Sequence, residues 1–473
     1  MMEIPLEMQE QFLEAKQLIE ANDDIKIYTH TDCDGICSGA ILSIILDRLG
    51  KTYDIENVNL DEIEDLNLNH KLTIFSDLGS GHGVDKNAKA GQEILILDHH
   101  PPLRDINYKN DKEYTYLEIN PLFYGIDGSY YICGGGLCYF LAKTFGFKDL
   151  SWIGVLAAIG DMQNNRSGHF EGLNEIIQED AINEGLLEVT KNDLNIYGRS
   201  TRPLYVALSY FSDVTLPLTN NQQEAKAVLE ELGVDEKHNR KTLSQVTEED
   251  KMEIKKYLSR MISKRVPLKY LKYVPKLIVG DAYTFLNEEE GSFLRDGAEF
   301  STAMNACGRN QKESVGVDIL KGDRLVALDE LEEVSKDHKY NLATSISKVA
   351  DNYHSEIIEL DNCQYFDCSE FDDNIAPNII GTITGMVLGY CNWRKPIIGF
   401  GKPDNGQVKV SLRCSKLLAY DGIHFGNIIR EIANEVGGTG GGHAVACGAY
   451  IPNEKKSDFL DKFNKKLQGK IAN

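Results

Sequence analysis

The stretch Ile94-Leu95-Ile96-Leu97-Asp98-His99-His100 decides how this chain is interpreted. Its four apolar residues predict a buried strand, and that strand ends in one carboxylate and two imidazoles. Two other apolar runs also end in acid, because residues 25–29 lead into His30-Thr31-Asp32-Cys33-Asp34-Gly35 and residues 72–76 lead into Asp77. Ligands of an open parallel sheet bind outside the carboxyl ends of its strands, so we expect these side chains to meet in one crevice.

A metal site is the simplest explanation for these acids. A further acid, Asp161, follows the apolar segment 152–160, and the predicted ligands are Asp32, Asp34, Asp77, His99 and Asp161. Any single Asp in such a place could instead cap a helix, but five groups on four successive segments favour metal binding. Carboxylates joined by an imidazole suit Mn²⁺ better than Mg²⁺. We therefore predict two divalent cations, preferably Mn²⁺ with Mg²⁺ as the second choice, and a catalytic Asp77 that bridges them.

Two histidines near these acids have open roles. His30 either completes the metal ligands or hydrogen-bonds to one of the acids. His100, the second predicted catalytic residue, is expected to point away from His99 in an extended chain. It either orients a phosphate or donates a proton, or it only hydrogen-bonds to a neighbour of the metal ligands.

Composition restricts the class of protein. A formal net charge of −23 argues against a protein that coats DNA nonspecifically, since such proteins carry a basic face. An enzyme that holds a few phosphates through metal ions does not need one. No apolar stretch is long enough for a membrane span, and the amino terminus lacks a secretory signal, so a cytoplasmic protein is expected. The ten dispersed cysteines favour buried free thiols over disulfides or a structural zinc site.

The pattern of apolar runs predicts an α/β protein of three parts. Residues 1–185 alternate strand-like and helix-like segments, as expected of a metal-binding domain with a parallel sheet. Residues 186–269 are charged and helix-prone, which predicts a helical connector whose charges form a solvated face. Residues 270–473 return to strand-like runs and predict a second α/β domain that binds substrate, with a cleft between it and the first. The length of 473 residues agrees with two or three domains.

These motifs together resemble the DHH phosphoesterase superfamily, which is named for the Asp-His-His triplet. The match includes the motif at 30–35, Asp77, the triplet at 98–100 and Gly160-Asp161-Met162-Gln163. The carboxyl-terminal part resembles the DHH-associated domain, and residues 197–203 and 299–309 resemble archaeal RecJ-like proteins. This resemblance implies a metal-dependent exonuclease that releases nucleotides one after another from single-stranded DNA or RNA, with a role in DNA replication or repair.

The same resemblance places phosphate-handling groups in the later part of the chain. A glycine-rich loop, Gly437–His443, can offer backbone N–H groups to a phosphate because no Cβ blocks the approach. Arginine supplies planar donors that match phosphate oxygens. The alternatives are a mobile surface turn for the loop and an ordinary salt bridge for the arginine at 309. The predicted substrate-binding residues are Asn305, whose role is left open, and Arg309, Arg413, Gly441, Gly442 and His443.

Two other functions remain. One is a phosphodiesterase for short oligonucleotides or cyclic dinucleotides, although such relatives are usually shorter and residues 186–265 favour a longer substrate. The other is a replisome component that docks on the GINS complex, because the family includes a catalytically degenerate relative that does so. The complete set of metal ligands argues against a purely structural role. The helical insert is the expected docking segment for GINS.

Overall fold

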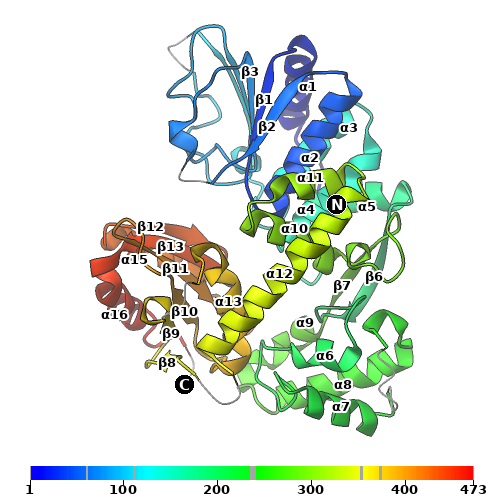
Figure 1. Cartoon of the computed structure of the whole chain (residues 1–473), viewed down its shortest axis with the longest axis vertical. Coiled ribbons are helices and arrows are strands. Elements are labelled where there is room, and N and C mark those ends of the chain that lie inside the picture. Colours follow the sequence, from blue (N-terminus) through cyan, green and yellow to red (C-terminus); the bar gives the residue numbers. More distant parts are fainter. Residues whose placement is uncertain are drawn as a thin grey trace. The chain divides into compact units, whose positions relative to one another are not determined.

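The computed structural model describes residues 2–59, 62–109, 113–234, 241–351, 355–371 and 375–471. They form two compact units (Figure 1). Each unit has its own hydrophobic core. The first unit comprises Met1–Asn192 with Gly280–Lys336, and the second comprises Asp193–Val279 with Asp337–Asn473. Among the described residues, none of the helices combines the length and the apolar character that spanning a bilayer requires.

The first unit is built on a five-stranded parallel sheet in the order β2-β1-β3-β4-β5. Its strands are β1 (Ile25–Thr29), β2 (Tyr53–Asn57), β3 (Leu72–Ser76), β4 (Glu93–Leu97) and β5 (Thr115–Ile119). The chain moves to one side of β1 to form β2 and then crosses to the other side to form β3. Ligand sites of open parallel sheets lie at such a switch in strand order. The predicted α/β fold with a parallel sheet is therefore confirmed.

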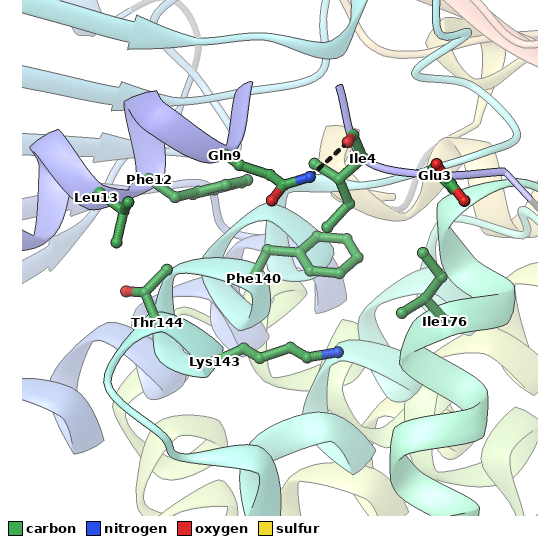
Figure 2. A pocket seen from close by; sticks show the side chains of 9 residues that line it. All are labelled: Glu3, Ile4, Gln9, Phe12, Leu13, Phe140, Lys143, Thr144 and Ile176. Carbon is green, nitrogen blue, oxygen red and sulfur yellow. Dashed lines mark hydrogen bonds between the residues drawn. The ribbon is translucent and has the colours of Figure 1, made fainter. Parts of the chain in front are cut away.

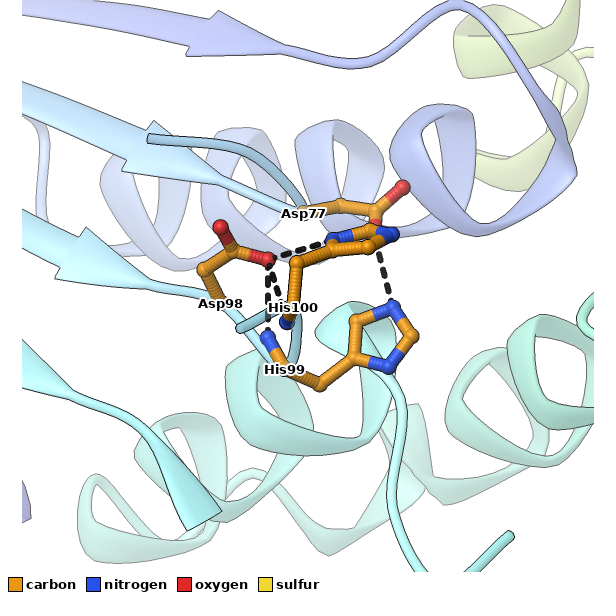
Figure 3. Close-up of side chains that lie close together, drawn as sticks. All are labelled: Asp77, Asp98, His99 and His100. Carbon is orange, nitrogen blue, oxygen red and sulfur yellow. Dashed lines mark hydrogen bonds and ion pairs between the residues drawn. The ribbon is translucent and has the colours of Figure 1, made fainter. Parts of the chain in front are cut away.

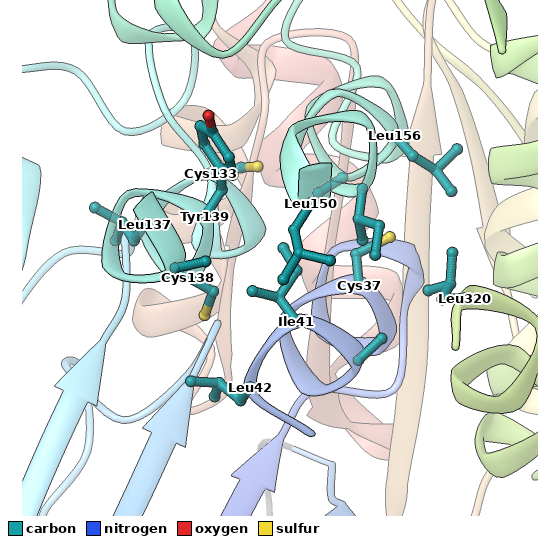
Figure 4. Packing of buried hydrophobic residues seen from close by; sticks show 14 of the residues in the cluster. Cys37, Ile41, Leu42, Cys133, Leu137, Cys138, Tyr139, Leu150, Leu156 and Leu320 are labelled. Carbon is teal, nitrogen blue, oxygen red and sulfur yellow. The ribbon is translucent and has the colours of Figure 1, made fainter. Parts of the chain in front are cut away.

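Helices pack on this sheet and on one another around the larger core. They are α1 (Leu6–Ala21), α2 (Cys33–Arg48), α3 (Gly134–Thr144), α4 (Ser151–Gly160), α5 (Leu173–Asn183), α10 (Gly297–Arg309) and α11 (Glu313–Leu320), with short 3₁₀ helices η1 (Ile63–Asp65), η2 (Pro121–Tyr124), η3 (Lys148–Leu150) and η6 (Phe293–Arg295). Residues 151–159 of α4 are all buried, as expected of a helix that is apolar all round. Ile41 and Leu42 of α2 lie in the same packed cluster as Leu137 of α3 (Figure 4). A two-stranded sheet, β6 (Leu187–Leu194) and β7 (Val279–Phe285), belongs mostly to this unit, and only Asp193, Leu194 and Val279 of its strands are assigned to the second.

A shallow cavity of about 450 Å³ opens beside α1 and α3. Phe12 and Leu13 of α1, Phe140 of α3 and Ile176 of α5 give it an apolar lining (Figure 2). None of the predicted site residues lines this cavity, so the sequence motifs point to a different part of the unit.

The second unit joins a helical part to a mixed sheet. The sheet has the order β12-β13-β11-β10-β9-β8 and consists of β8 (Ile358–Glu359), β9 (Gln364–Asp367), β10 (Ile397–Phe400), β11 (Gln407–Arg413), β12 (Thr439–Gly442) and β13 (Ala446–Pro452). Its helices are α6 (Leu204–Ser209), α7 (Gln222–Glu231), α8 (Glu248–Ser263), α9 (Val274–Ile278), α13 (Ile380–Met386), α14 (Lys416–Tyr420), α15 (Phe425–Glu435) and α16 (Lys456–Lys466), and the chain enters its second segment through α12 (Val326–Val349). The 3₁₀ helices are η4 (Leu243–Gln245), η5 (Leu268–Tyr273), η7 (Cys368–Glu370), η8 (Pro377–Ile379), η9 (Val387–Tyr390) and η10 (Asn453–Lys455). The helical insert and the second α/β domain are thus both present, while the predicted boundaries at 185 and 269 stay predictions.

The structure tests the predictions for the cysteines and for the glycine-rich segment. All ten cysteines are buried and unpaired, which confirms the prediction of free thiols. The prediction of a loop over the glycine-rich segment is wrong for Thr439–Gly442, because these residues form the edge strand β12 on β13. The absence of side chains makes this close pairing possible, since a Cβ on Gly440 would lie 2.7 Å from the Cβ of Ala449.

Candidate metal centre

Strand register brings the three sequence motifs to one edge of the parallel sheet. Thr29 of β1 pairs with Ser76 of β3, and Ser76 pairs with Leu97 of β4. The residues that follow these three strand ends are His30, Asp77 and Asp98. They therefore leave the sheet side by side, at the switch in strand order.

Three groups of possible ligands overlap here, one of which is Asp77 with the Asp98-His99-His100 triplet. The first group considered contains His30, Asp32 and Asp77, whose ligand atoms lie within 4.8 Å of one another. His30 Nδ1 is 3.1 Å from Asp32 Oδ2 and 3.6 Å from Asp77 Oδ2. Asp32 is also the N-cap of α2, since its Oδ1 accepts a hydrogen bond from the Gly35 N–H at 3.0 Å. One carboxylate thus both caps a helix and offers its second oxygen to the group.

The second group contains Asp34, His99 and Asp161. His99 Nε2 lies 3.6 Å from Asp34 Oδ2 and 3.4 Å from Asp161 Oδ2. The other ring nitrogen, Nδ1, donates a hydrogen bond to the Gly128 carbonyl at 2.7 Å. This bond places the proton of a neutral imidazole on Nδ1 and leaves the Nε2 lone pair directed at the two carboxylates, as metal-binding histidines require.

Asp77 lies between the two groups. Its Oδ2 faces His30, while its Oδ1 lies 3.2 Å from His99 Nε2. The residue is buried and has a φ of 59°, a left-handed conformation that is uncommon outside glycine. Such strain persists only where the surroundings fix it, and it concentrates at functional sites. The two carboxylate oxygens can therefore reach a cation in each group.

The first turn of α3 holds Asp34. The N–H groups of Gly134 and Gly135 donate to Asp34 Oδ2 at 2.8 Å and to Oδ1 at 2.7 Å. A helix N-terminus stabilises a negative charge, and these bonds fix both carboxylate oxygens. A Cβ on Gly135 would lie 3.0 Å from Asp34 Oδ1 and 2.5 Å from the Cβ of Ala157. Glycine is required for this approach, so the run Gly134-Gly135-Gly136 is the sequence feature that could have indicated this support for Asp34.

Asp98 positions the histidines that follow it. Its Oδ1 accepts hydrogen bonds from the N–H groups of His99 and His100 and from His100 Nδ1, at 2.8, 3.2 and 2.8 Å (Figure 3). Its Oδ2 accepts from the Ser80 N–H at 2.9 Å. Burial opposes ionisation of Asp98, but the charge and hydrogen bond of His100 hold its pKa well below the usual range. The carboxylate thus acts as an acceptor for the loop, a role that the triplet alone did not reveal.

The predicted orientation of His100 is wrong. Its ring lies against the ring of His99, with centroids 4.2 Å apart, because the bond to Asp98 turns it back toward the strand ends. About half of the His100 side chain remains exposed. Burial lowers its pKa and the carboxylate of Asp98 raises it, and the net pKa is above the ordinary value. The His100 imidazole is therefore fixed by Asp98, favours its charged form and faces solvent beside Asp77.

The charges of this centre fit divalent cations. Three buried polar atoms of this centre have no hydrogen-bond partner among the described residues, namely His30 Nδ1, Asp77 Oδ2 and Asp161 Oδ2. Burial together with the nearby charge of Asp34 raises the pKa of Asp77 well above its ordinary value and that of Asp161 to about 7. The histidines offset only part of this buried negative charge, as the raised pKa values of Asp77 and Asp161 show, so cations bound among the carboxylates would supply the remainder. Oxygen donors with one imidazole in each group agree with Mn²⁺ or Mg²⁺.

Two predicted substrate-binding residues lie on α10 of the same unit. Asn305 Oδ1 accepts a hydrogen bond from the Cys33 N–H at 3.1 Å, so this side chain supports the loop that carries Asp32. A Cβ on Gly308 would lie 1.7 Å from the Thr31 carbonyl oxygen, which shows how closely α10 approaches that loop. Arg309 follows as the last residue of α10 and is half-buried. Their contact with a substrate stays a prediction.

The other predicted substrate-binding residues belong to the second unit. Ala446 pairs with Arg413 across β13 and β11, and its carbonyl accepts a hydrogen bond from the His443 N–H at 2.9 Å. Gly441 and Gly442 precede His443 in β12, so all four predicted residues gather at one end of this sheet. Burial lowers the pKa of Arg413, which makes no salt bridge with a residue of the described ranges. A guanidinium of this kind is available to an anion.

Comparison with protein families identifies three matching domain models in chain order. The DHH family N-terminal domain matches residues 24–155, the DHH-CID domain matches residues 196–274, and the DHHA1 domain matches residues 362–469. The uncharacterized protein MJ0831 of Methanocaldococcus jannaschii is 30% identical over 446 residues, which is 93% of this chain and 92% of that protein. A shorter match, 23% identical over 171 residues, covers 34% of this chain and 28% of the single-stranded-DNA-specific exonuclease RecJ of Haemophilus influenzae.

Solved structures share the fold at low sequence identity. CDC45 from Entamoeba histolytica matches with a TM-score of 0.59 and 14% identity, covering 98% of this chain and 99% of that one. RecJ from Thermus thermophilus in complex with Mn²⁺ matches with a TM-score of 0.56 and 13% identity, covering 98% of this chain and 55% of that one. The fold is thus found both in a nuclease structure that contains Mn²⁺ and in CDC45.

Proposed function

The chain belongs to the DHH family, and from this premise we propose that it is a metal-dependent exonuclease acting on single-stranded nucleic acid. The observation that carries the proposal is the pair of ligand groups joined by Asp77, with unpartnered carboxylate oxygens buried between them. A fold alone does not assign an activity, so the argument depends on these side chains.

Two divalent cations, preferably Mn²⁺, would lower the pKa of a bound water and stabilise the leaving oxygen of a phosphodiester. His30, Asp32 and Asp77 would hold one of them, and Asp34, His99 and Asp161, with Asp77, the other. The protein itself orients the ligands in advance, because hydrogen bonds from α3 fix Asp34 and a hydrogen bond to the Gly128 carbonyl fixes His99 before any ion binds. His100 supplies an exposed, readily charged imidazole beside them, suited to contact a phosphate oxygen or to protonate a leaving group.

The choice of a single strand as substrate draws on the relatives and on the second unit. RecJ of H. influenzae is described as specific for single-stranded DNA, and we extend that substrate class, DNA or RNA, to this chain. Arg413 and His443 lie at one end of the second sheet and provide donors suited to phosphate groups. A role in DNA replication or repair follows from the same proposal.

End-labelled oligonucleotides test the proposal. We expect stepwise release of mononucleotides from single strands with Mn²⁺ or Mg²⁺ and no release in EDTA, while the duplex form of the same sequence is spared. Dinucleotides and cyclic dinucleotides, assayed in parallel, address the short-substrate alternative; faster turnover of those than of longer strands would favour it. Failure of the metal-loaded protein to hydrolyse any single strand would overturn the assignment.

Docking on the GINS complex stays a separate prediction. Likeness to CDC45 at 14% identity concerns the fold, and the presence of both ligand groups argues against a purely structural role. Co-purification with and without the insert would address it directly.

A further inference from the structure

The second unit carries a basic tract within an acidic protein. Between Glu253 and Asp281 the sequence contains no acidic residue, although the whole chain has a net charge of −23. The same interval contains eight cationic side chains: Lys255, Lys256, Arg260, Lys264, Arg265, Lys269, Lys272 and Lys276. Such a concentration of positive charge favours the binding of a polyanion. The metal centre lies in the first unit and makes no use of it.

In the part of this tract that forms η5 and α9, the side chains lie in three rows along the helical surface. Residues three apart eclipse one another in a 3₁₀ helix and residues four apart share a face in an α-helix, so η5 followed by α9 places Lys269, Lys272 and Lys276 on one side. All three lysines are exposed. A second exposed row holds Leu268, Leu271 and Pro275, and a third, buried row begins with Tyr270 and Val274. The element thus presents cations and apolar groups together to solvent.

Aromatic rings lie directly beneath the cations. Lys272 Nζ lies 4.7 Å from the ring centroid of Tyr273, and Lys276 Nζ lies 5.6 Å from that of Tyr420 on α14. The two rings are 5.5 Å apart with an interplanar angle of 37°, and both are half-buried. Two acids lie near these rings: Asp421 pairs with Lys269 at 2.5 Å, and Asp213 accepts a hydrogen bond from the Lys416 N–H of α14 at 2.9 Å. Lys272 and Lys276 make no salt bridge with any residue that the structure describes.

We propose that this surface, defined as Leu268, Leu271, Lys272, Tyr273, Lys276 and Tyr420, binds single-stranded nucleic acid outside the metal centre. Phosphate groups would meet the lysines, and unpaired bases would stack on the tyrosine rings and the exposed leucines, the combination that single-strand-binding surfaces use. An acidic polypeptide would use the lysines but has no need of paired rings. The proposal rests on the proposed function for its substrate class, and it adds a place where the strand is held apart from hydrolysis.

Binding of a labelled oligothymidylate to the full-length protein in EDTA, followed by fluorescence anisotropy at several salt concentrations, tests the surface without any hydrolysis. The double variant Lys272→Gln/Lys276→Gln should bind about tenfold more weakly, and the slope of log K against log salt should fall by about 1.4, since each phosphate contact with a single strand contributes roughly 0.7. Tyr273→Leu keeps the packing and removes the ring, and it should weaken binding at least about fivefold with an unchanged slope.

A matched control removes the same charge elsewhere in the second unit. Lys455 and Lys470 are exposed, and Lys455→Gln/Lys470→Gln should leave affinity and slope as in the parent. An equal loss in this control, or no loss in Lys272→Gln/Lys276→Gln, would overturn the assignment of the surface. Equal displacement of the oligonucleotide by polyglutamate of the same charge would also overturn it, in favour of an acidic protein partner. If the parent hydrolyses single strands while these binding results fail, the proposed function stands and only this surface falls.

Discussion

Replacing Gly135 with alanine tests whether the first turn of α3 sets the affinity of the metal centre. The new methyl group would lie 2.5 Å from the Cβ of Ala157 and 3.0 Å from Asp34 Oδ1. Neither atom can swing aside, because one is fixed to a buried helix and the other belongs to a carboxylate whose two oxygens each accept a hydrogen bond from a backbone N–H group. The turn must therefore move away from Asp34, which lengthens the bonds that orient this carboxylate.

The size of the effect follows from three contributions. Overpacking a buried site costs about 1–3 kcal/mol, and weakening a hydrogen bond to a charged group costs up to about 1.5–3 kcal/mol. Alanine gains up to about 1 kcal/mol over glycine in a helix. We expect the free energy of unfolding to fall by about 2 kcal/mol, and the affinity for Mn²⁺ to fall about 10–100-fold, as for other groups that orient metal ligands.

The neighbouring glycine provides a matched control. A Cβ on Gly136 would lie 2.5 Å from the terminal methyl of Ile132 and 3.1 Å from that of Ile177, and both methyl groups can rotate away. Gly136→Ala should therefore change the affinity for Mn²⁺ little. Calorimetric titration with Mn²⁺ and urea unfolding of the metal-free proteins give both quantities. Parent-like Mn²⁺ affinity in Gly135→Ala, or equal losses in the two variants, would refute the reasoning.

Four further predictions concern the charges of the centre. Asp77→Asn removes a proposed metal ligand, so hydrolysis should fall at least about 1,000-fold, as when a catalytic group is removed. The change also removes a buried carboxylate that repels its neighbours, so the unfolding midpoint of the metal-free protein should stay equal or rise. A lower midpoint would contradict this. Because the pKa of Asp161 is about 7 without metal, a cation must displace its proton, and Mn²⁺ affinity measured by titration should weaken as pH falls from 8 to 6, with a smaller dependence in Asp161→Asn. The same raised pKa means that the metal-free protein should lose stability as pH rises from about 4 to 7, which urea unfolding without metal can check. Asp98→Asn removes the charge that raises the pKa of His100, so the histidine signal followed by NMR should titrate at lower pH than in the parent, and an unchanged titration would count against this contact.

The sequence predicted the sheet and the convergence of its strand ends because both follow from local pattern. Apolar runs define β1, β3 and β4, and parallel pairing then forces the residues after Thr29, Ser76 and Leu97 to lie together. The five carboxylates and imidazoles chosen as ligands, together with His30, gather in two groups, and Asp77 of one group lies 3.2 Å from His99 of the other.

The remaining features depend on contacts that pattern does not encode. The role of Asp98 as an acceptor, and with it the direction of His100, follows from how the chain turns after β4. The bonds from α3 to Asp34 join residues 100 positions apart. Strand β12 forms because glycines fit against β13, whereas glycine-rich composition alone favours a loop. Each of these features depends on tertiary packing, so the periodicity of a single sequence cannot predict it.

The contact between α10 and the loop after β1 has a consequence for biosynthesis. Asn305 and Gly308 meet Cys33 and Thr31, so the loop bearing Asp32 gains this support only when residue 308 has been translated. Chains emerge from the ribosome amino terminus first, and early segments wait for their partners. A nascent or truncated polypeptide ending before α10 therefore lacks this brace. The timing of translation delays full assembly of the candidate metal centre until much of the rest of the polypeptide exists.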